Sequence, residues 1–259
     1  METRLTEFSY GYCVTEEFAN GMGAGLKAAP YFPSLYVEGK AGGGFDVLIG
    51  SALFLQFKLC HELTRGTALE CKKGLLPPTF YRFWLHRKDQ SDQHKMLMEL
   101  EQAGNQVYYI APAFADVDAL NRYYVTKQVL ANSALFSPLD IGPLPNNKRH
   151  RVSFRRGDST AYFMSEPRKL RARSRPEVVS KAMDHPTVSA WNDVREWLRG
   201  VSEKLESIIQ ERHGRKWQDA VEWSASQQYD EGPLERTAYL ARTYFGAELF
   251  LAAKPKQQG

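Results

Sequence analysis

The sequence lacks the features that mark membrane, secreted and disulfide-linked proteins. It has no run of about 18 apolar residues, and the segment METRLTEFSYGY has neither the apolar core nor the cleavage site of a signal peptide. Its three cysteines, Cys13, Cys60 and Cys71, match neither a disulfide framework nor the spacing of zinc ligands. These absences predict a cytoplasmic protein with reduced thiols and no membrane partner.

A large excess of charge of one sign is also missing. The chain has 34 Lys and Arg residues against 30 Asp and Glu, and its hydrophobic content of 43% is ordinary for a globular protein. A length of 259 residues fits one large domain, or one domain with an appendage. Positive charge gathers only between residues 148 and 175, where ten Lys and Arg residues accompany two acidic ones. A polyanionic partner is therefore compatible with the chain.

Apolar spacing and turn residues predict alternating helices and strands. A helix is expected from Thr15, where the threonine would cap the first turn, followed by short strands at 35–38, 45–49 and 53–59. A strand from Phe80, a helix at 90–103 and a buried strand at 107–110 come next. Further elements are a helix at 116–134, strands at 151–155 and 161–165, and long helices at 186–212 and 233–253.

Polar side chains interrupt two of these strands. Asp46 follows three glycines in an otherwise apolar strand, and Gln56 and Lys58 share one face of the next strand because side chains alternate. If the two strands pair through the turn GSA, these three side chains converge at one end of the sheet. This pattern predicts a catalytic site made of Asp46, Gln56 and Lys58.

The residue types at this site suit hydrolysis of a phosphodiester. Mg²⁺ takes hard oxygen ligands, here the Asp46 carboxylate, the Gln56 amide oxygen and the carbonyl of Phe57. A carboxylate of the first helix, Glu16 or Glu17, would complete the ligand set. Lys58 would orient the attacking water or stabilise the phosphate as a fixed cation. The expected cofactor is Mg²⁺ or Mn²⁺.

This arrangement resembles the PD-(D/E)XK nuclease superfamily, and in particular its Gln-x-Lys branch of Mrr-like restriction enzymes and antiphage nuclease effectors. The match covers Asp46, Gln56 and Lys58 within residues 5–112. The resemblance implies an α/β, restriction-endonuclease-like core in the order helix, three strands, helix, strand. It also implies that Gln93, His94 or Lys95, on the next helix, contacts the phosphate. Two departures are the missing Pro before Asp46 and the Gln in place of Glu at residue 56.

The basic segment predicts the surface that contacts nucleic acid. Arginine and lysine side chains neutralise phosphates and so add affinity that falls as salt rises. The residues expected there are Arg149, Arg151, Arg155, Arg156, Arg168, Lys169 and Arg171.

The sequence thus predicts a nuclease-like domain over residues 1–175 and a helical interaction or regulatory region over 176–259. The expected activity is that of a metal-dependent DNA endonuclease, a phosphodiesterase acting in prokaryotic defence against phage or foreign DNA. DNA would be one partner, and a second copy of the chain or a sensor protein another.

Three other interpretations remain open. A catalytically inactive nuclease-fold protein could bind nucleic acid or scaffold a defence complex. A helical interaction protein would use mainly the region from Pro186 onward. In the simplest alternative, Gln56 and Lys58 form the solvent face of an edge strand and Asp46 is a turn residue.

Overall fold

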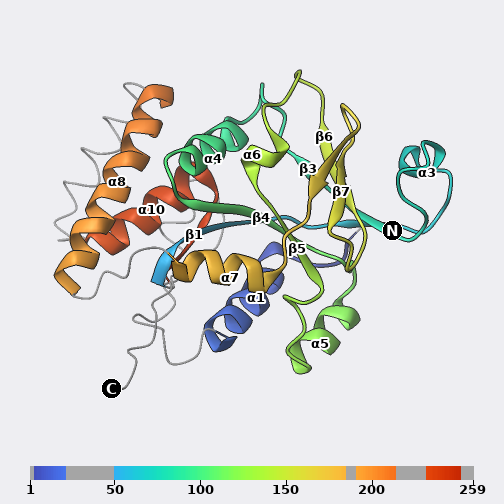
Figure 1. The fold of residues 1–259 in the computed structure, drawn as a ribbon, viewed down its shortest axis with the longest axis horizontal. Helices are drawn as coiled ribbons and strands as arrows, with labels where there is room; N and C mark the ends of the chain where they lie inside the picture. The colour runs from blue at the N-terminus through green and yellow to red at the C-terminus, as the bar shows by residue number, and fades with distance from the viewer. Residues whose placement is uncertain (1–2, 22–49, 185–190, 214–231, 252–259) are drawn as a thin grey trace.

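The computed structural model describes residues 3–21, 50–184, 191–213 and 232–251, which form a mixed α/β fold with two sheets (Figure 1). The helices are α1 (Glu7–Gly21), α3 (Leu69–Lys72), α4 (Gln93–Gln102), α5 (Val117–Val125), α6 (Pro138–Ile141), α7 (Arg175–Asp184), α8 (Trp191–His213) and α10 (Pro233–Phe245). The strands are β1 (Gly50–Phe57), β2 (His61–Leu63), β3 (Phe80–Leu85), β4 (Gln106–Pro112), β5 (Ser133–Phe136), β6 (His150–Phe154), β7 (Thr160–Phe163), β8 (Arg168–Arg171) and β9 (Glu248–Leu251).

The four-stranded sheet has the order β5-β4-β1-β9 and carries the predicted Gln-x-Lys strand in its interior. Strand β1 pairs parallel with β4, so that Gln56 lies opposite Tyr109, and antiparallel with β9. Strand β5 pairs antiparallel with β4. Because β1 has a neighbour on each side, the interpretation of Gln56 and Lys58 as the solvent face of an edge strand is wrong.

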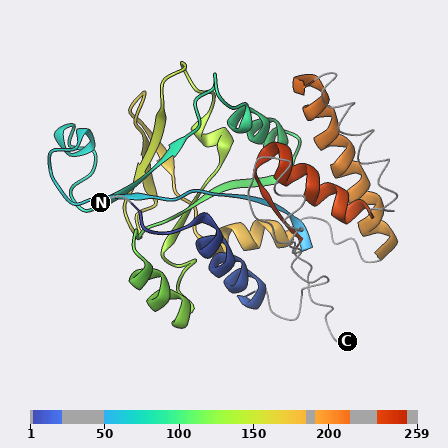
Figure 2. The same cartoon turned by 180° about the vertical axis from the view of Figure 1, so that it is seen from behind.

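Helices cover both faces of this sheet, and the predicted alternation along β1 is confirmed. Leu53, Leu55 and Phe57 pack with residues of α1, α5 and α7 in one hydrophobic cluster. Phe54 belongs to the other cluster, which α4, α8, α10 and the second sheet share. Figures 1 and 2 show α1 and α5 on one side of the β1–β4 pair and α4 on the other.

The second sheet is an antiparallel meander with the order β2-β3-β6-β7-β8. Its inner face adds Tyr81, Phe83, Val152, Phe154 and Phe163 to the core. Alternation therefore directs Arg82 and Trp84 of β3 to the outer face. The predicted strands from Phe80, at 151–155 and at 161–165 are confirmed, with shifts of a few residues, while β8 was not predicted.

The first helix starts earlier than its sequence pattern predicts. The hydroxyl oxygen of Thr6 accepts the N–H of Ser9 at 3.1 Å and caps α1, so Thr15 lies inside the helix and is buried. A Cβ at Gly11 would come within 2.9 Å of the Phe57 ring. The glycine therefore allows α1 to lie close against β1.

Two predicted helices are too long. Helix α5 ends at Val125, because Lys127 has a φ of 56° and the chain turns away toward β5. Helix α10 ends at Phe245, where Gly246 adopts the left-handed conformation, and residues 248–251 form β9 instead of continuing the helix. The region from residue 176 is therefore not purely helical, since it supplies one strand of the four-stranded sheet.

Only part of the predicted core order falls within the described residues. The segments 35–38 and 45–49 lie outside the described residues, so the predicted meander has only its third member, β1, in the structure. Along Gly50–Leu55 the antiparallel neighbour of β1 is β9. None of the described helices is both long and apolar enough to cross a membrane.

Candidate functional site

Lys58 follows the last residue of β1 and lies inside the protein. It is only 7% exposed, and its Nζ donates to Oε1 of Gln93, at the start of α4, at 3.3 Å. Burial lowers the pKa of Lys58 to about 8, because the charged form loses its hydration, while the negative charge of Glu7 raises it in part. An ammonium group with this pKa is mostly protonated at neutral pH and can still release its proton.

Gln56 lies two residues earlier on the same face and is equally buried, at 7% exposure. Its Nε2 donates to the carbonyl oxygen of Phe57 at 3.1 Å. Its Oε1 is buried and accepts no hydrogen bond from the residues that the structure describes. Since buried acceptors are rarely left unsatisfied, this amide marks a place where a further donor or a cation fits.

Gln56 could hold a Mg²⁺ ion together with the carbonyl of Phe57 if its side-chain amide were turned over. Rotation about the last side-chain bond of Gln56 exchanges its Oε1 and Nε2, so either atom can lie 3.1 Å from the Phe57 oxygen. Adjacent ligands of an octahedral Mg²⁺ lie about 3 Å apart. Two oxygens this close repel each other unless a cation lies between them.

Gly246 brings the end of α10 against the same site. It has a φ of +58°, and a Cβ there would lie 3.0 Å from Oε1 of Gln56 and overlap the amide of Gln93. A glycine therefore serves both the helix end and the close approach to the two amides. Gly246 was not predicted as a site residue, and the one signal for it in the sequence is a glycine inside an otherwise helical pattern.

Tyr109 and His94 form the wall beside Lys58. Nζ of Lys58 lies 5.6 Å from the centre of the Tyr109 ring, and the Tyr109 hydroxyl is 2.8 Å from Nδ1 of His94. Nε2 of His94 is 2.8 Å from the carbonyl oxygen of Gly142, which can only accept. Nε2 therefore carries the proton, and the Tyr109 hydroxyl donates to Nδ1. Burial lowers the pKa of His94 to about 4, so the imidazole is neutral and structural.

Glu7 is a carboxylate of α1 within electrostatic reach of Lys58. It lies in the first turn of α1, one turn before Gly11, which contacts Phe57. Desolvation raises the pKa of Glu7 even though its side chain keeps contact with solvent, and the charge of Lys58 lowers it in part. Glu7 was not predicted as a site residue, because the first helix was expected to begin only at Thr15.

The other predicted ligands are not seen at this site. Asp46 lies outside the described residues. Glu16 pairs with Lys127 at 2.6 Å, and the carboxylate of Glu17 accepts the N–H groups of Val129 and Leu130 at 2.5 and 2.9 Å. Both carboxylates thus hold the segment after α5, and their role as metal ligands stays a prediction. Gln93, one of the three residues expected near the phosphate, contacts Lys58.

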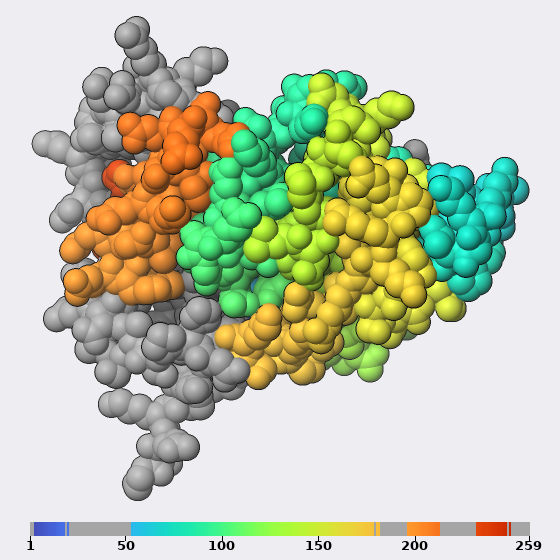
Figure 3. Space-filling model, turned by 45° about the horizontal axis from the view of Figure 1, so that its top comes forward, coloured from blue at the N-terminus to red at the C-terminus, as the bar shows by residue number. Residues whose placement is uncertain are grey.

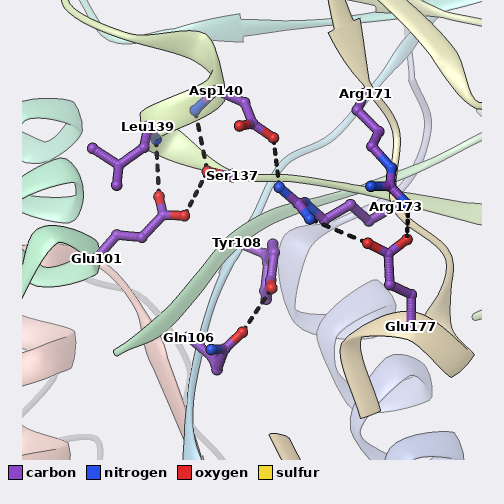
Figure 4. A network of polar contacts seen from close by, with 9 residues as sticks. All are labelled: Glu101, Gln106, Tyr108, Ser137, Leu139, Asp140, Arg171, Arg173 and Glu177. Atoms are coloured by element: carbon purple, nitrogen blue, oxygen red, sulfur yellow. Dashed lines mark hydrogen bonds and ion pairs between the residues drawn. The ribbon is translucent and has the colours of Figure 1, made fainter. Parts of the chain in front are cut away.

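Several residues of the predicted nucleic-acid surface bind their own chain. Arg156 donates to the carbonyl oxygen of Ala113 at 2.6 Å, and Arg168 donates to that of Ile141. Arg171 pairs with Glu177 at 3.0 Å, and Arg173 pairs with both Glu177 and Asp140, which ties α7 to α6 (Figure 4). These contacts account for much of the local excess of arginine.

Two residues of the same segment face outward at a tryptophan. The guanidinium carbons of Arg149 and Arg151 lie 4.5 and 5.5 Å from the centre of the Trp84 ring, and that of Arg82 lies at 5.4 Å. Elsewhere in the segment, Lys169 is exposed, and Arg155 makes a long ion pair of 3.7 Å with Asp158. Three guanidinium groups thus gather around the Trp84 ring.

Comparisons with known proteins add no assignment. No model of a known protein family, no curated protein and no solved structure matches the chain. Within the described residues, no three His, Cys, Asp or Glu side chains are close enough together to hold a metal ion. Function is therefore inferred from the geometry of the chain itself and from the resemblance of its motif.

Proposed function

We propose that the chain is a Mg²⁺- or Mn²⁺-dependent DNA endonuclease whose site lies at the carboxyl end of β1. The observation that carries this proposal is the buried Lys58 two residues from the buried amide of Gln56, whose Oε1 accepts no hydrogen bond from the described residues. Burying a lysine and an unsatisfied amide together costs stability, which a purely structural strand would avoid. The setting in prokaryotic defence rests on the resemblance to antiphage nucleases alone.

Gln56 and the Phe57 carbonyl would hold the metal ion, with Asp46 as the predicted carboxylate ligand and Glu7 as a further carboxylate nearby. When bound, such an ion neutralises charge on the phosphate and lowers the pKa of a water molecule. Lys58 then acts as a fixed ammonium group that holds the water or a phosphate oxygen. Its charge counts strongly because little water surrounds it.

The neighbours of Lys58 keep its ammonium group in place. Gln93 accepts a hydrogen bond from Nζ, and the Tyr109 ring lies along its side. Tyr109 in turn is fixed through its hydroxyl by the neutral His94. A positioned cation needs no reorganisation when charge develops on the phosphate.

The test replaces Lys58 by methionine, which keeps the length of the side chain and removes the charge. Supercoiled plasmid is incubated with the protein and Mg²⁺ or Mn²⁺, with EDTA as the blank. Removal of a preorganised cation should lower the cleavage rate by about a hundredfold or more. Lys204→Met is the matched control, because Lys204 is an exposed lysine of α8 with no part in the candidate site, and it should cleave like the wild type.

Cleavage that survives in Lys58→Met would remove the proposal. A wild-type protein that binds DNA and leaves it intact with both metals would instead support the rival, a catalytically inactive nuclease-fold protein. The neutral amide of Gln56, which offers less charge to a metal than a carboxylate does, is the feature that keeps this rival in the comparison.

A further inference from the structure

The outer face of the five-stranded sheet carries a row of polar and aromatic side chains. Arg82, Ser153, Tyr162 and Lys169 are directly opposite one another in the register of β3, β6, β7 and β8, so they point to the same face. Trp84 lies two residues along from Arg82 and opposite Arg151. We call Arg82, Trp84, Arg149 and Arg151 the tryptophan cluster.

The tryptophan cluster has too little negative charge for its cations. Three guanidinium groups lie within 5.5 Å of one ring centre, and the carboxylate that pairs with them is that of Glu70, which bonds to Arg151 at 2.8 Å. Desolvation lowers the pKa of Arg82, and the charges of Arg151 and Arg149 lower it further. Among the described residues, two positive charges thus remain in excess, and a polyanion would balance them.

Helix α3 covers only part of this face. Glu70 of α3 also accepts a hydrogen bond from Ser153 at 2.8 Å, which seats the segment over the middle of the sheet. Figure 3 shows this segment beside the strands β6 to β8 at one end of the molecule. Arg149 is exposed, and Trp84 and Tyr162 are half-buried. An extended ligand therefore has access to both aromatic rings.

The arrangement of rings and guanidinium planes is suited to unpaired bases. Bases stack on aromatic rings and on arginine planes when they are not held in a duplex. A duplex would offer only its phosphates to the same residues, and phosphates alone give no reason for a tryptophan among the arginines. The chemistry therefore favours a single strand over a duplex.

Electrostatic interactions connect the tryptophan cluster with the candidate catalytic site. His86 comes two residues after Trp84, and the charges of both Lys58 and Arg149 contribute to lowering its pKa, after desolvation. His86 is therefore within electrostatic reach of both groups.

We propose that the tryptophan cluster is a binding platform for single-stranded DNA, on which an unpaired base stacks at Trp84 while the arginines bind the flanking phosphates. The platform includes Arg82 and Trp84, which the basic segment did not indicate. The inference rests on the proposed function only in taking the bound strand to be the one that reaches Lys58.

The test measures binding without cleavage. A fluorescein-labelled single strand of about 20 thymidines and a duplex of the same length are titrated with the full chain in EDTA, and anisotropy and tryptophan fluorescence are recorded. The wild type should prefer the single strand and show quenching of its tryptophan fluorescence. Trp84→Leu should lose about tenfold in affinity and most of the quenching.

A charge-matched pair of variants locates the platform. Arg149→Gln should weaken single-strand binding by about threefold to tenfold, because one phosphate contact is lost. Arg122→Gln removes an equally exposed arginine that also lies beside a ring, Tyr123, but on α5, and should change binding by less than about twofold. Thermal unfolding checks that Trp84→Leu is folded, and Arg149→Gln leaves the ring in place.

Equal losses in Arg149→Gln and Arg122→Gln, or a duplex bound as tightly as the single strand without quenching, would overturn the platform. These results are independent of the cleavage assay. Single-strand binding by a protein that never cleaves would leave the platform intact and remove the nuclease. Cleavage that requires Lys58 but is unchanged by substitution of Trp84 or Arg149 would support the nuclease and remove the platform.

Discussion

Lys58 and Arg149 are both cations beside an aromatic ring, but one is buried and the other is exposed. Lys58 is buried at the end of β1, and burial holds its pKa near 8. Arg149 lies on the outside next to Trp84 and is exposed. Burying a cation costs free energy but fixes the position of its charge. An exposed cation costs little free energy, and the affinity that it provides is screened by salt. The first kind suits chemistry and the second suits binding.

The largest expected difference between the two regions is in pH dependence. If Lys58 acts as an ammonium group, cleavage should fall as the pH rises through about 8 and be about a hundredfold lower at pH 10. Binding at the tryptophan cluster should stay nearly constant over the same range, because guanidinium groups remain protonated. Single-turnover cleavage rates and anisotropy, measured at each pH on one preparation, give both curves.

A cleavage rate that rises through pH 8 would assign Lys58 the role of a base instead of a cation, and would break this part of the comparison. Lys58→Arg is the useful second variant. Its guanidinium stays charged, so any cleavage that it retains should lose the fall above pH 8.

A smaller effect is expected in stability. The pKa of Lys58 is lower in the folded protein than in the unfolded chain, so the folded state carries the full penalty below pH 8 and loses it as the pH rises toward about 10.5. Lys58→Met should therefore raise the free energy of unfolding by about 1 to 3 kcal/mol at pH 7. Arg149→Met should change it by less than about 0.5 kcal/mol.

Urea unfolding at pH 7 and pH 9.5 checks this prediction. The gain of Lys58→Met over the wild type should shrink at the higher pH, while the effect of Arg149→Met stays the same. A Lys58→Met protein that is less stable at both values would show that the lysine is satisfied where it lies, and that its burial is structural.

The sequence predicted the region around Lys58 better than the region around Trp84. Strict alternation along 53–59 was enough to place Gln56 and Lys58 on one face, because successive side chains of a strand point to opposite faces. The start of the first helix was missed although its signal is local, because Thr6 and not Thr15 caps α1. Glu7 therefore lies in the first turn of the helix, and its charge acts on Lys58.

The contacts around Trp84 depend on strand pairing, which a local sequence pattern does not reveal. Arg149, Arg156 and Arg168 look alike in the sequence, but the register sends Arg149 to Trp84 while backbone carbonyls bind the other two. Trp84 was predicted only as a member of the strand that begins at Phe80. The strand β9 was missed because the left-handed Gly246 ends a helix whose apolar spacing continues beyond it.

The smallest expected effect separates Arg149 from Arg156 by the salt dependence of binding. Each phosphate contact adds about 0.7 to the slope of log affinity against log salt for a single strand, so Arg149→Gln should reduce the slope by about that amount. Arg156→Gln breaks hydrogen bonds to Ala113 and Tyr81, and should lower stability by about 1 to 3 kcal/mol with the slope unchanged. Anisotropy titrations between about 50 and 200 mM salt measure the slopes. If Arg156→Gln reduced the slope as much as Arg149→Gln, the nucleic acid would follow the whole basic segment and not the platform at Trp84.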